Sequence, residues 1–197
     1  MRKGLVASML SVFPFLGDGD NDGVPLCKAE DYEILEELGC GISATVHKIR
    51  NKETGEIYAL KMVDGFLDAR KEIDALRRLG HENVVEMIAK NCGVSSNPFH
   101  IVLEHLPCDL ESAFESREHG PRIRKNKREI LRQVLEGIAH VHSKEIEHKD
   151  IYPKNILVDP ETMAVKICDF GNCVHNPSER NNDILRLSSL YRGILYS

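Results

Sequence analysis

Three polar residues in the second half of the sequence have types and an order that suit phosphoryl transfer. Asp150 and Asn155 stand in the string His-Lys-Asp-Ile-Tyr-Pro-Lys-Asn, and Asp169 begins Asp-Phe-Gly fourteen positions after Asn155. Transfer of a phosphoryl group to a hydroxyl needs a carboxylate that orients and deprotonates the acceptor, and oxygen ligands that hold Mg²⁺ against a triphosphate. Asp150, Asn155 and Asp169 suit these roles.

The string resembles the catalytic loop and the Asp-Phe-Gly motif of eukaryotic protein kinases. The resemblance implies that Asp150 is the catalytic base and that Asn155 and Asp169 bind Mg²⁺. Tyr152 departs from the pattern, because Ser/Thr kinases carry there a lysine that contacts the γ-phosphate. We hypothesise that Lys154, where receptor tyrosine kinases carry a catalytic-loop arginine, replaces that charge in part. The alternative is that Lys154 points to solvent.

A glycine-containing loop between two predicted strands resembles the kinase phosphate-binding loop. Glycines let backbone N–H groups approach phosphate oxygens, although Ala44 replaces the third glycine of the pattern. Lys61 follows on the next strand, and Glu72, eleven residues later, matches the helix that supplies its carboxylate partner. The resemblance implies that both are catalytic, that Lys61 contacts ATP, and that the loop binds ATP through Leu38, Gly39, Cys40, Gly41, Ile42, Ser43, Ala44, Thr45 and Val46. The short spacing disfavours a cyclin-type partner.

Residues 102–110 resemble the hinge that joins the two kinase lobes. The resemblance implies that the backbones of Glu104 and Leu106 meet adenine, that Leu103 is the gatekeeper, and that Asp109 bonds the ribose. A buried strand followed by a surface Asp would show the same pattern. The pocket floor would be formed by Leu157 with Leu38, Val46 and Ala59.

The last fifteen residues resemble an activation segment. Ser188 to Gly193 are similar to a segment of the cyclin-dependent kinase group, and this alignment puts Asp183 where the phosphorylated threonine would be. A fixed carboxylate there would mimic part of a phosphate's charge, so we predict no need for an upstream kinase. Lys149 keeps the positive charge that commonly docks such a phosphate. This alignment and Asp109 imply a cyclin-dependent-kinase-like protein with a role in the cell cycle, and the short run before Glu72 suggests a relative of the kinases that activate that group.

The elements that must position these residues follow from apolar periodicity. Short apolar runs predict strands over 32–38, 45–50 and 58–63, then a helix around Glu72, then strands over 87–92 and 100–105. A longer helix over 125–143 has an apolar face formed by Ile130, Leu131, Val134, Leu135, Ile138 and Val141. Two short strands follow at 156–158 and 165–168. This order predicts an α+β, bilobal kinase-like fold with a β-rich N-lobe, one N-lobe helix and a helical C-lobe.

We expect three parts: a disordered leader or linker (1–29), an N-lobe with hinge (30–107) and a partial C-lobe (108–197). The C-lobe is expected to be incomplete, lacking the long helix that anchors the catalytic loop, because Ile194-Leu195 replace the expected Pro-Glu after Arg192. Residues 18–23 match the first half of an EF-hand calcium loop, but Ala29 stands where a bidentate Glu is required, so an acidic linker is favoured.

Composition narrows the function classes. The 197 residues carry a net charge of −5, which gives no reason to expect nucleic acid. No stretch is long and apolar enough for a membrane span. Six cysteines without paired spacing favour a reducing, cytoplasmic and/or nuclear location. The basic run at 122–128 is interpreted as a solvated helix start rather than a nuclear signal.

The predicted function is an ATP- and Mg²⁺-dependent protein Ser/Thr kinase with a protein substrate. Pro153 in the catalytic loop resembles Ser/Thr rather than tyrosine kinases. The alternative is a pseudokinase or nucleotide-binding scaffold with little catalysis. Tyr152 and the short C-lobe favour the alternative, whereas the full set of base and metal residues favours the enzyme.

Overall fold

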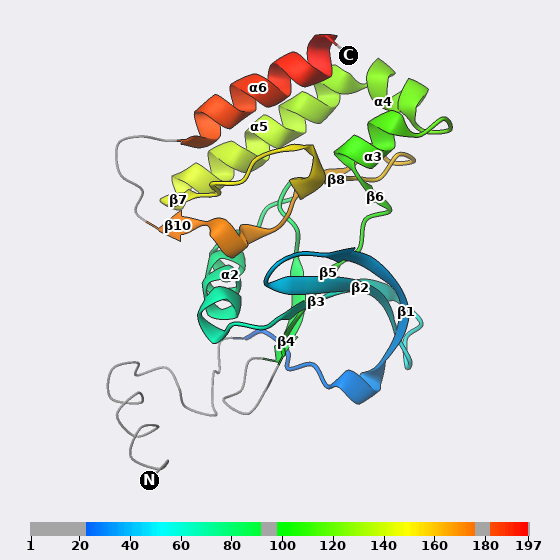
Figure 1. Ribbon diagram of the computed structural model, residues 1–197, viewed down its shortest axis with the longest axis vertical. Coiled ribbons are helices and arrows are strands. Elements are labelled where there is room, and N and C mark those ends of the chain that lie inside the picture. The colour runs from blue at the N-terminus through cyan, green and yellow to red at the C-terminus, as the bar shows by residue number, and fades with distance from the viewer. Residues whose placement is uncertain (1–22, 92–97, 176–181, 197) are drawn as a thin grey trace.

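Apolar runs in the first half of the chain build a five-stranded antiparallel sheet, in the order β1-β2-β3-β5-β4 (Figure 1). The computed structural model describes residues 23–91, 98–175 and 182–196. The strands are β1 (Tyr32–Cys40), β2 (Ala44–Asn51), β3 (Ile57–Val63), β4 (Met87–Asn91) and β5 (Phe99–Glu104). The five strands agree with those predicted from the short apolar runs.

One helix, α2 (Phe66–Arg78), covers the sheet face that looks toward the second lobe. Its buried side chains include Ile73 and Leu76, which recur at helical spacing. These side chains belong to a core that runs from the sheet into the second lobe, where it includes Ile130 and Phe170. The sheet and α2 form the N-lobe, and everything from β6 onward forms the C-lobe.

The chain before the sheet is partly built into it. Residues 1–22, which hold most of the predicted leader and of the calcium-loop-like segment, lie outside the described residues. The backbone N–H of Cys27 donates to the Lys90 carbonyl at 2.8 Å, and Lys90 N–H donates to the Pro25 carbonyl at 2.9 Å. The Cys27 side chain is buried against the outer sheet face. Residues 25–27 therefore extend the sheet beyond β4, and the 3-10 helix η1 (Ala29–Asp31) leads into β1.

The C-lobe combines helices with two small sheets, β6-β8-β9 and β10-β7. Its elements are β6 (Cys108–Asp109), α3 (Leu110–Glu115), α4 (Gly120–Lys125), α5 (Lys127–Ser143), β7 (Ile146–Glu147), η2 (Pro153–Asn155), β8 (Ile156–Val158), β9 (Val165–Ile167), η3 (Phe170–Asn172), β10 (Val174–His175) and α6 (Asn182–Tyr196). The α+β, bilobal arrangement is the expected one.

Helix α5 forms the centre of the C-lobe. Its predicted apolar face is buried except for Leu135, whose exposed fraction is 51%. Gly137 takes the central place instead, because a Cβ there would lie 2.8 Å from both the Asn83 carbonyl oxygen and Ile167 Cδ1. The missing side chain lets α5 approach β9 closely. The prediction that Leu135 is buried is wrong. An apolar pattern counts large side chains, so it does not identify Gly137 as a buried position.

Helix α6 corrects the prediction for the end of the chain. Residues 188–193 lie inside this helix and do not form an extended activation segment. Figure 1 shows α6 alongside α5 on the outer side of the C-lobe. Asp183, Leu187 and Leu190 recur at helical spacing, and Leu190 and Leu187 pack into or against the core. The C-lobe therefore contains a helix that packs beside the catalytic loop. The expectation that a helix anchoring this loop is missing is wrong.

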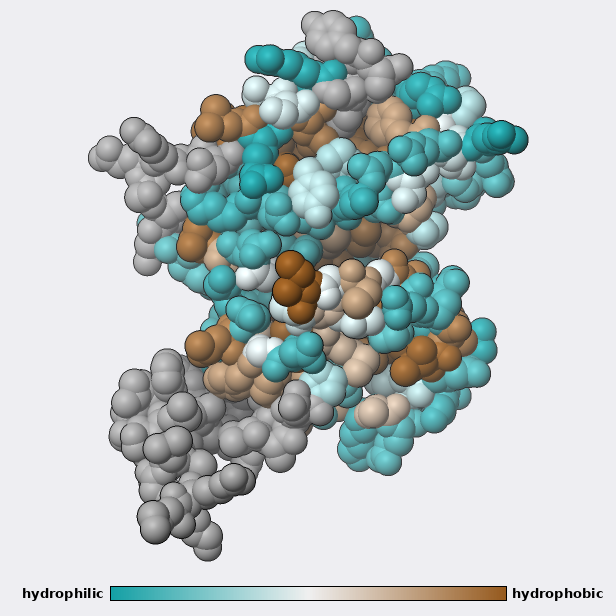
Figure 2. Space-filling model, viewed as in Figure 1, coloured by the Kyte–Doolittle hydropathy of each residue, from teal (hydrophilic) through white to brown (hydrophobic). Residues whose placement is uncertain are grey.

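Polar and hydrophobic residues are mixed on the face of the molecule that Figure 2 shows. The molecule is narrower between the lobes, and hydrophobic residues are exposed there. Exposed large hydrophobic side chains include Ile42 of the glycine loop and Leu185 of α6. None of the described helices has the combination of length and apolar character needed to cross a membrane.

Candidate active site

A buried ion-pair triad joins the N-lobe to the Asp-Phe-Gly motif. Lys61 Nζ on β3 lies 2.6 Å from Glu72 Oε2 on α2 and 2.7 Å from Asp169 Oδ1. Burial alone would lower the pKa of Lys61, but the negative charges of Glu72 and Asp169 outweigh it and raise that pKa. Lys61 is therefore a permanent cation, and the pairing of Lys61 with Glu72 that the resemblance to protein kinases implied is present.

Asp169 occupies a constrained turn between the two lobes. Its backbone has a φ of 63°, a left-handed conformation that Asp tolerates because its short polar side chain bonds locally. The side chain accepts from the Gly171 N–H, and Lys61 contacts the same Oδ1 atom. Burial opposes ionisation, but Lys61 lowers the pKa of Asp169 below its usual value. Asp169 is thus an anionic oxygen donor, and its side-chain bonds to Lys61 and to the Gly171 N–H both use Oδ1.

The catalytic loop, residues 148–155, brings Asp150 and Asn155 together. Asn155 is buried and its Nδ2 donates to the Asp150 carbonyl at 2.9 Å and to Asp150 Oδ2 at 3.1 Å. Both bonds use the amide nitrogen, so the amide oxygen remains as an acceptor. Amide and carboxylate oxygens are the donors that Mg²⁺ prefers, and Asn155 with Asp169 therefore fits a Mg²⁺ site.

His148 connects the catalytic loop to the Asp-Phe-Gly motif. Its imidazole is buried, with Nε2 2.9 Å from the Cys168 carbonyl oxygen, and its ring centroid lies 4.7 Å from that of Phe170 in an edge-to-face arrangement. Burial lowers the pKa of His148, so the ring is neutral at pH 7. A neutral imidazole can donate one bond to the carbonyl and pack against the phenyl ring. The positions of Asp150 and Asp169 are coupled through this contact.

Asp183, the first-turn carboxylate of α6, anchors the catalytic loop. Its Oδ2 accepts from His148 N–H at 2.7 Å and its Oδ1 accepts from Lys149 N–H at 2.8 Å, while His142 Nε2 lies 3.1 Å from Oδ2. The carboxylate is fully buried. Burial opposes ionisation, but these hydrogen bonds lower the pKa of Asp183. The prediction that Asp183 mimics an activation-loop phosphate is wrong, because a carboxylate that is enclosed by loop backbone cannot present its charge to solvent.

Lys149 has an internal partner as well. Its Nζ lies 2.8 Å from Glu147 Oε2, and Glu147 is fully buried. The backbone of Lys149 has a φ of 69°, which the two loop N–H bonds to Asp183 help to hold. The charge of Lys149 therefore neutralises the buried Glu147 carboxylate and is not left to bind an activation-loop phosphate.

Comparison with known proteins decides the family. The protein kinase domain model matches residues 32–193, which is most of the chain and includes every motif described above. The chain belongs to the protein kinase family. It is 34% identical, over 149 residues, to the serine/threonine-protein kinase TIO of Arabidopsis thaliana. The matched region covers 72% of this chain and 11% of that relative, so the kinase spans about a tenth of the relative's length.

The structure corrects the role that we predicted for Lys154. Its Nζ lies 3.2 Å from Glu111 Oε2 on α3, and this hydrogen bond raises the pKa of Lys154. No ion pair links Lys154 to Asp150 among the residues described. Lys154 lies one residue after Pro153 in the turn η2, which directs it toward α3 rather than toward the catalytic carboxylate.

Arg186 is the cation that sequence reasoning missed. Its Nη1 lies 3.5 Å from Asp150 Oδ1, one helical turn after Asp183 on α6. In the part of the chain that the structure describes, it is the cation paired directly with Asp150. No local motif identifies this contact, because it depends on how α6 packs against the loop.

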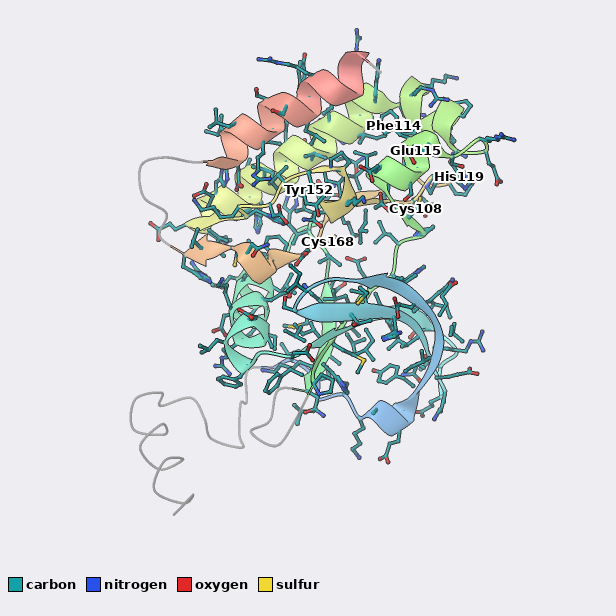
Figure 3. All side chains as sticks on the ribbon, viewed as in Figure 1. Cys108, Phe114, Glu115, His119, Tyr152 and Cys168 are labelled. Carbon is teal, nitrogen blue, oxygen red and sulfur yellow. The ribbon has the colours of Figure 1, made fainter. Side chains whose placement is uncertain are left out.

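An open apolar groove with a volume of about 620 Å³ is lined by Ile151, which follows Asp150 in the loop, and by Arg186, the ion-pair partner of Asp150. Its walls come from α3, the catalytic loop and α6: Glu111, Phe114, Glu115, Ile151, Tyr152, Pro153, Leu185, Arg186, Ser189 and Leu190. Phe114 and Glu115 lie on α3, and Tyr152 lies in the catalytic loop of the same lobe (Figure 3). Tyr152 lines this groove and is 38% exposed. It contributes an aromatic ring and a hydroxyl to the lining but no positive charge.

The residues predicted to bind ATP surround the junction of the lobes. Cys40 and Thr45 pair across the β1–β2 hairpin, and the Gly41 N–H donates to the Ala44 carbonyl at 2.8 Å. The turn between them is exposed, so most of its backbone is accessible to a ligand. Val46 and Ala59 lie on the neighbouring strands β2 and β3.

The hinge residues also have structural partners. Leu103 is buried at the end of β5, and the Glu104 carboxylate lies 2.7 Å from Lys166 Nζ. The Asp109 carboxylate caps α3 by accepting from Ser112 N–H at 2.9 Å, and β6 places Asp109 opposite Leu157. These contacts account for the residue types at the hinge without a nucleotide. Their roles in adenine and ribose binding, with that of Leu106, stay predictions.

Proposed function

We propose that this protein kinase transfers the γ-phosphoryl group of ATP to a Ser or Thr hydroxyl of a protein. The observation that carries the proposal is the joint placement of Asp150, Asn155 and the Lys61–Asp169 pair by one connected set of bonds. The kinase family and the named activity of the relative support this function. Pro153 in the catalytic loop supports Ser/Thr rather than Tyr as acceptor.

In the proposed reaction Asp150 accepts the proton of the substrate hydroxyl as its oxygen forms a bond to the γ-phosphorus. The bond between that phosphorus and the β,γ-bridging oxygen breaks, and ADP leaves with the electron pair. Asn155 fixes the orientation of the Asp150 carboxylate, and Lys61 contributes positive charge next to Asp169. Mg²⁺ held by Asn155 and Asp169 would neutralise phosphate charge.

The substrate protein is proposed to approach along the groove beside Asp150. The groove is open and is lined by Ile151 and Tyr152, which follow Asp150 in the loop, so an extended segment lying in it would bring a hydroxyl close to the catalytic carboxylate. A protein substrate fits this geometry, because the lining is mainly apolar and wide enough for side chains.

A finer assignment stays a prediction. The cyclin-dependent-kinase-like group and a cell-cycle role depended on Asp109 and on residues 188–193, and the latter form part of a helix. Asp109 is therefore the remaining support for that group. Independence from a cyclin-type partner and a cytoplasmic or nuclear location also stay predictions.

Transfer of labelled γ-phosphate from ATP to a mixture of Ser-, Thr- and Tyr-containing peptides tests the proposal. Asp150→Asn should reduce transfer at least about 100-fold, because it removes the base but keeps the shape of the side chain. Asp74→Asn, a surface change on α2, should leave transfer unchanged. Equal transfer by wild type and Asp150→Asn would refute the proposal. Nucleotide binding without transfer by wild type would favour the alternative, a nucleotide-binding scaffold.

A further inference from the structure

The acceptor side of the site needs a positive charge that the catalytic loop does not provide. Negative charge spreads over the oxygens of the phosphoryl group during transfer, and fixed cations lower the energy of that state. Lys149 and Lys154 pair with Glu147 and Glu111. Tyr152 carries no positive charge. Both lysines of the loop are therefore engaged with carboxylates other than Asp150.

Arg186 stands where such a charge is required. Its guanidinium contacts Asp150 Oδ1, whereas Asn155 contacts Oδ2 of the same carboxylate. The guanidinium also lines the groove through which a protein substrate is proposed to approach. Its side chain is 47% exposed, so it can contact the carboxylate and an entering anion with different donors.

The position of Arg186 is determined by the same helix that anchors the loop. Residues three apart lie on one face of a helix. Asp183 holds the loop backbone through its bonds to His148 and Lys149, and Arg186 lies three residues later. One turn of α6 thus sets both the loop conformation and the distance from the guanidinium to Asp150.

We infer that Arg186 is a catalytic cation of this kinase, which orients Asp150 and supplies from α6 the charge that Tyr152 cannot supply. This inference rests on the proposed function. An arginine suits the role because its charge is permanent and its planar group has five N–H donors.

The decisive comparison uses Arg186→Ala, Arg186→Lys, Tyr152→Lys and the double variant Arg186→Ala/Tyr152→Lys. Arg192→Ala, an exposed arginine on the same helix, is the matched control. For each protein, kcat and KM for phosphotransfer are measured, together with the melting temperature. A second measurement, by calorimetry, compares the affinities for Mg²⁺-ADP alone and for Mg²⁺-ADP with aluminium fluoride, a planar anionic mimic of the phosphoryl group.

Arg186→Ala should lower kcat at least about tenfold with a small change in KM for ATP, because the charge acts on the transition state. It should weaken binding of the aluminium fluoride complex by a similar factor and leave Mg²⁺-ADP binding unchanged. Arg186→Lys should retain part of the activity. Tyr152→Lys should rescue Arg186→Ala more than it accelerates wild type. Arg192→Ala should behave as wild type, and the melting temperatures should agree within a few degrees.

An unchanged or higher kcat in Arg186→Ala, with wild-type affinity for the aluminium fluoride complex, would overturn the inference. A higher kcat would mean that the Arg186–Asp150 pair inhibits the enzyme. If wild type transfers no phosphate but Arg186→Ala still weakens the aluminium fluoride complex selectively, the proposed function fails while the placement of charge by Arg186 stands. Equal binding by both proteins would overturn the inference irrespective of turnover.

Discussion

The two halves of the active site are built in different ways. In the nucleotide half, Lys61 is buried and lies within 2.7 Å of two carboxylates, Glu72 and Asp169. In the acceptor half, Asp150 pairs at 3.5 Å with Arg186, whose half-exposed side chain belongs to a residue that lines the open groove. The first half is a closed network between two lobes, and the second is an accessible edge of one lobe.

The difference fits what each half would accommodate in the proposed reaction. A nucleotide presents the same phosphates in every turnover, so a fixed and desolvated cation stabilises them without reorganisation. A protein substrate needs access, and an ion pair in contact with water is weaker and easier to rearrange. The rigid part of the acceptor half is accordingly the loop backbone rather than the Arg186 side chain. Asp183 holds this backbone by accepting two hydrogen bonds from its N–H groups.

The strongest test of the nucleotide half is Lys61→Met. It should reduce phosphotransfer at least about 100-fold, because a permanent cation next to Asp169 is lost. Lys52→Met, which removes an exposed lysine in the β2–β3 turn, is the control and should keep wild-type activity. Phosphotransfer assays with purified, folded variants measure the effect. Activity within about threefold of wild type would show that the buried pair is structural only.

Asp183→Ala tests the rigid part of the acceptor half. We expect a loss of about 3 kcal/mol in the free energy of unfolding, because two buried loop N–H groups and His142 lose a charged acceptor. Urea denaturation measures this loss. The surface change Asp74→Ala should cost less than about 1 kcal/mol. A similar cost for both variants would mean that α6 does not anchor the loop.

The contribution of Asp183 should also depend on pH. Its pKa is lower in the folded protein than the ordinary value near 4, so the folded state binds this proton less tightly than the unfolded state. The stability that the ionised carboxylate contributes is present above about pH 4 and is lost as the pH falls further. The difference in unfolding free energy between wild type and Asp183→Asn should therefore shrink below about pH 4. A constant difference down to pH 2.5 would contradict the assignment.

Cysteine labelling sharpens the position of the nucleotide half without any reference to turnover. Burial raises the pKa of Cys27 and Cys173 to about 11, whereas Cys40 is exposed in the glycine-containing loop. At pH 8, alkylation followed by mass spectrometry should label Cys40 before these two thiols. Mg²⁺-ATP at about ten times its Kd should slow labelling of Cys40 about tenfold. Unchanged labelling would place the nucleotide elsewhere.

The smallest effect is expected for Lys154→Ala. Because Lys154 pairs with Glu111 on the surface, its removal should change kcat by less than about twofold. Kinetic assays beside Arg186→Ala compare the two cations directly. A tenfold loss in Lys154→Ala would return to Lys154 the role that we first predicted for it.

Local patterns were sufficient for much of this site. The strands of the N-lobe follow from short apolar runs, and α2 follows from the recurrence of Ile73 and Leu76 at helical spacing. The pairing of Lys61 with Glu72 was predictable from the resemblance to protein kinases, in which the helix after this strand supplies the carboxylate partner of the lysine. The spacing of Leu187 and Leu190 indicates the helix α6. This signal was overlooked because residues 188–193 were aligned with an activation segment.

The sequence by itself determined the residue types that the proposed reaction requires: a candidate base, two candidate oxygen ligands for Mg²⁺, a lysine for the phosphates and its carboxylate partner, in an order that few other functions require. The tertiary structure alone decided which cation pairs with Asp150. Lys154 is four residues from Asp150 but is turned toward Glu111, whereas Arg186 is distant in sequence and is brought to Asp150 by α6. The physical reason is that charges act through space, and the distances between side chains on separate elements are set by packing and by anchors such as Asp183.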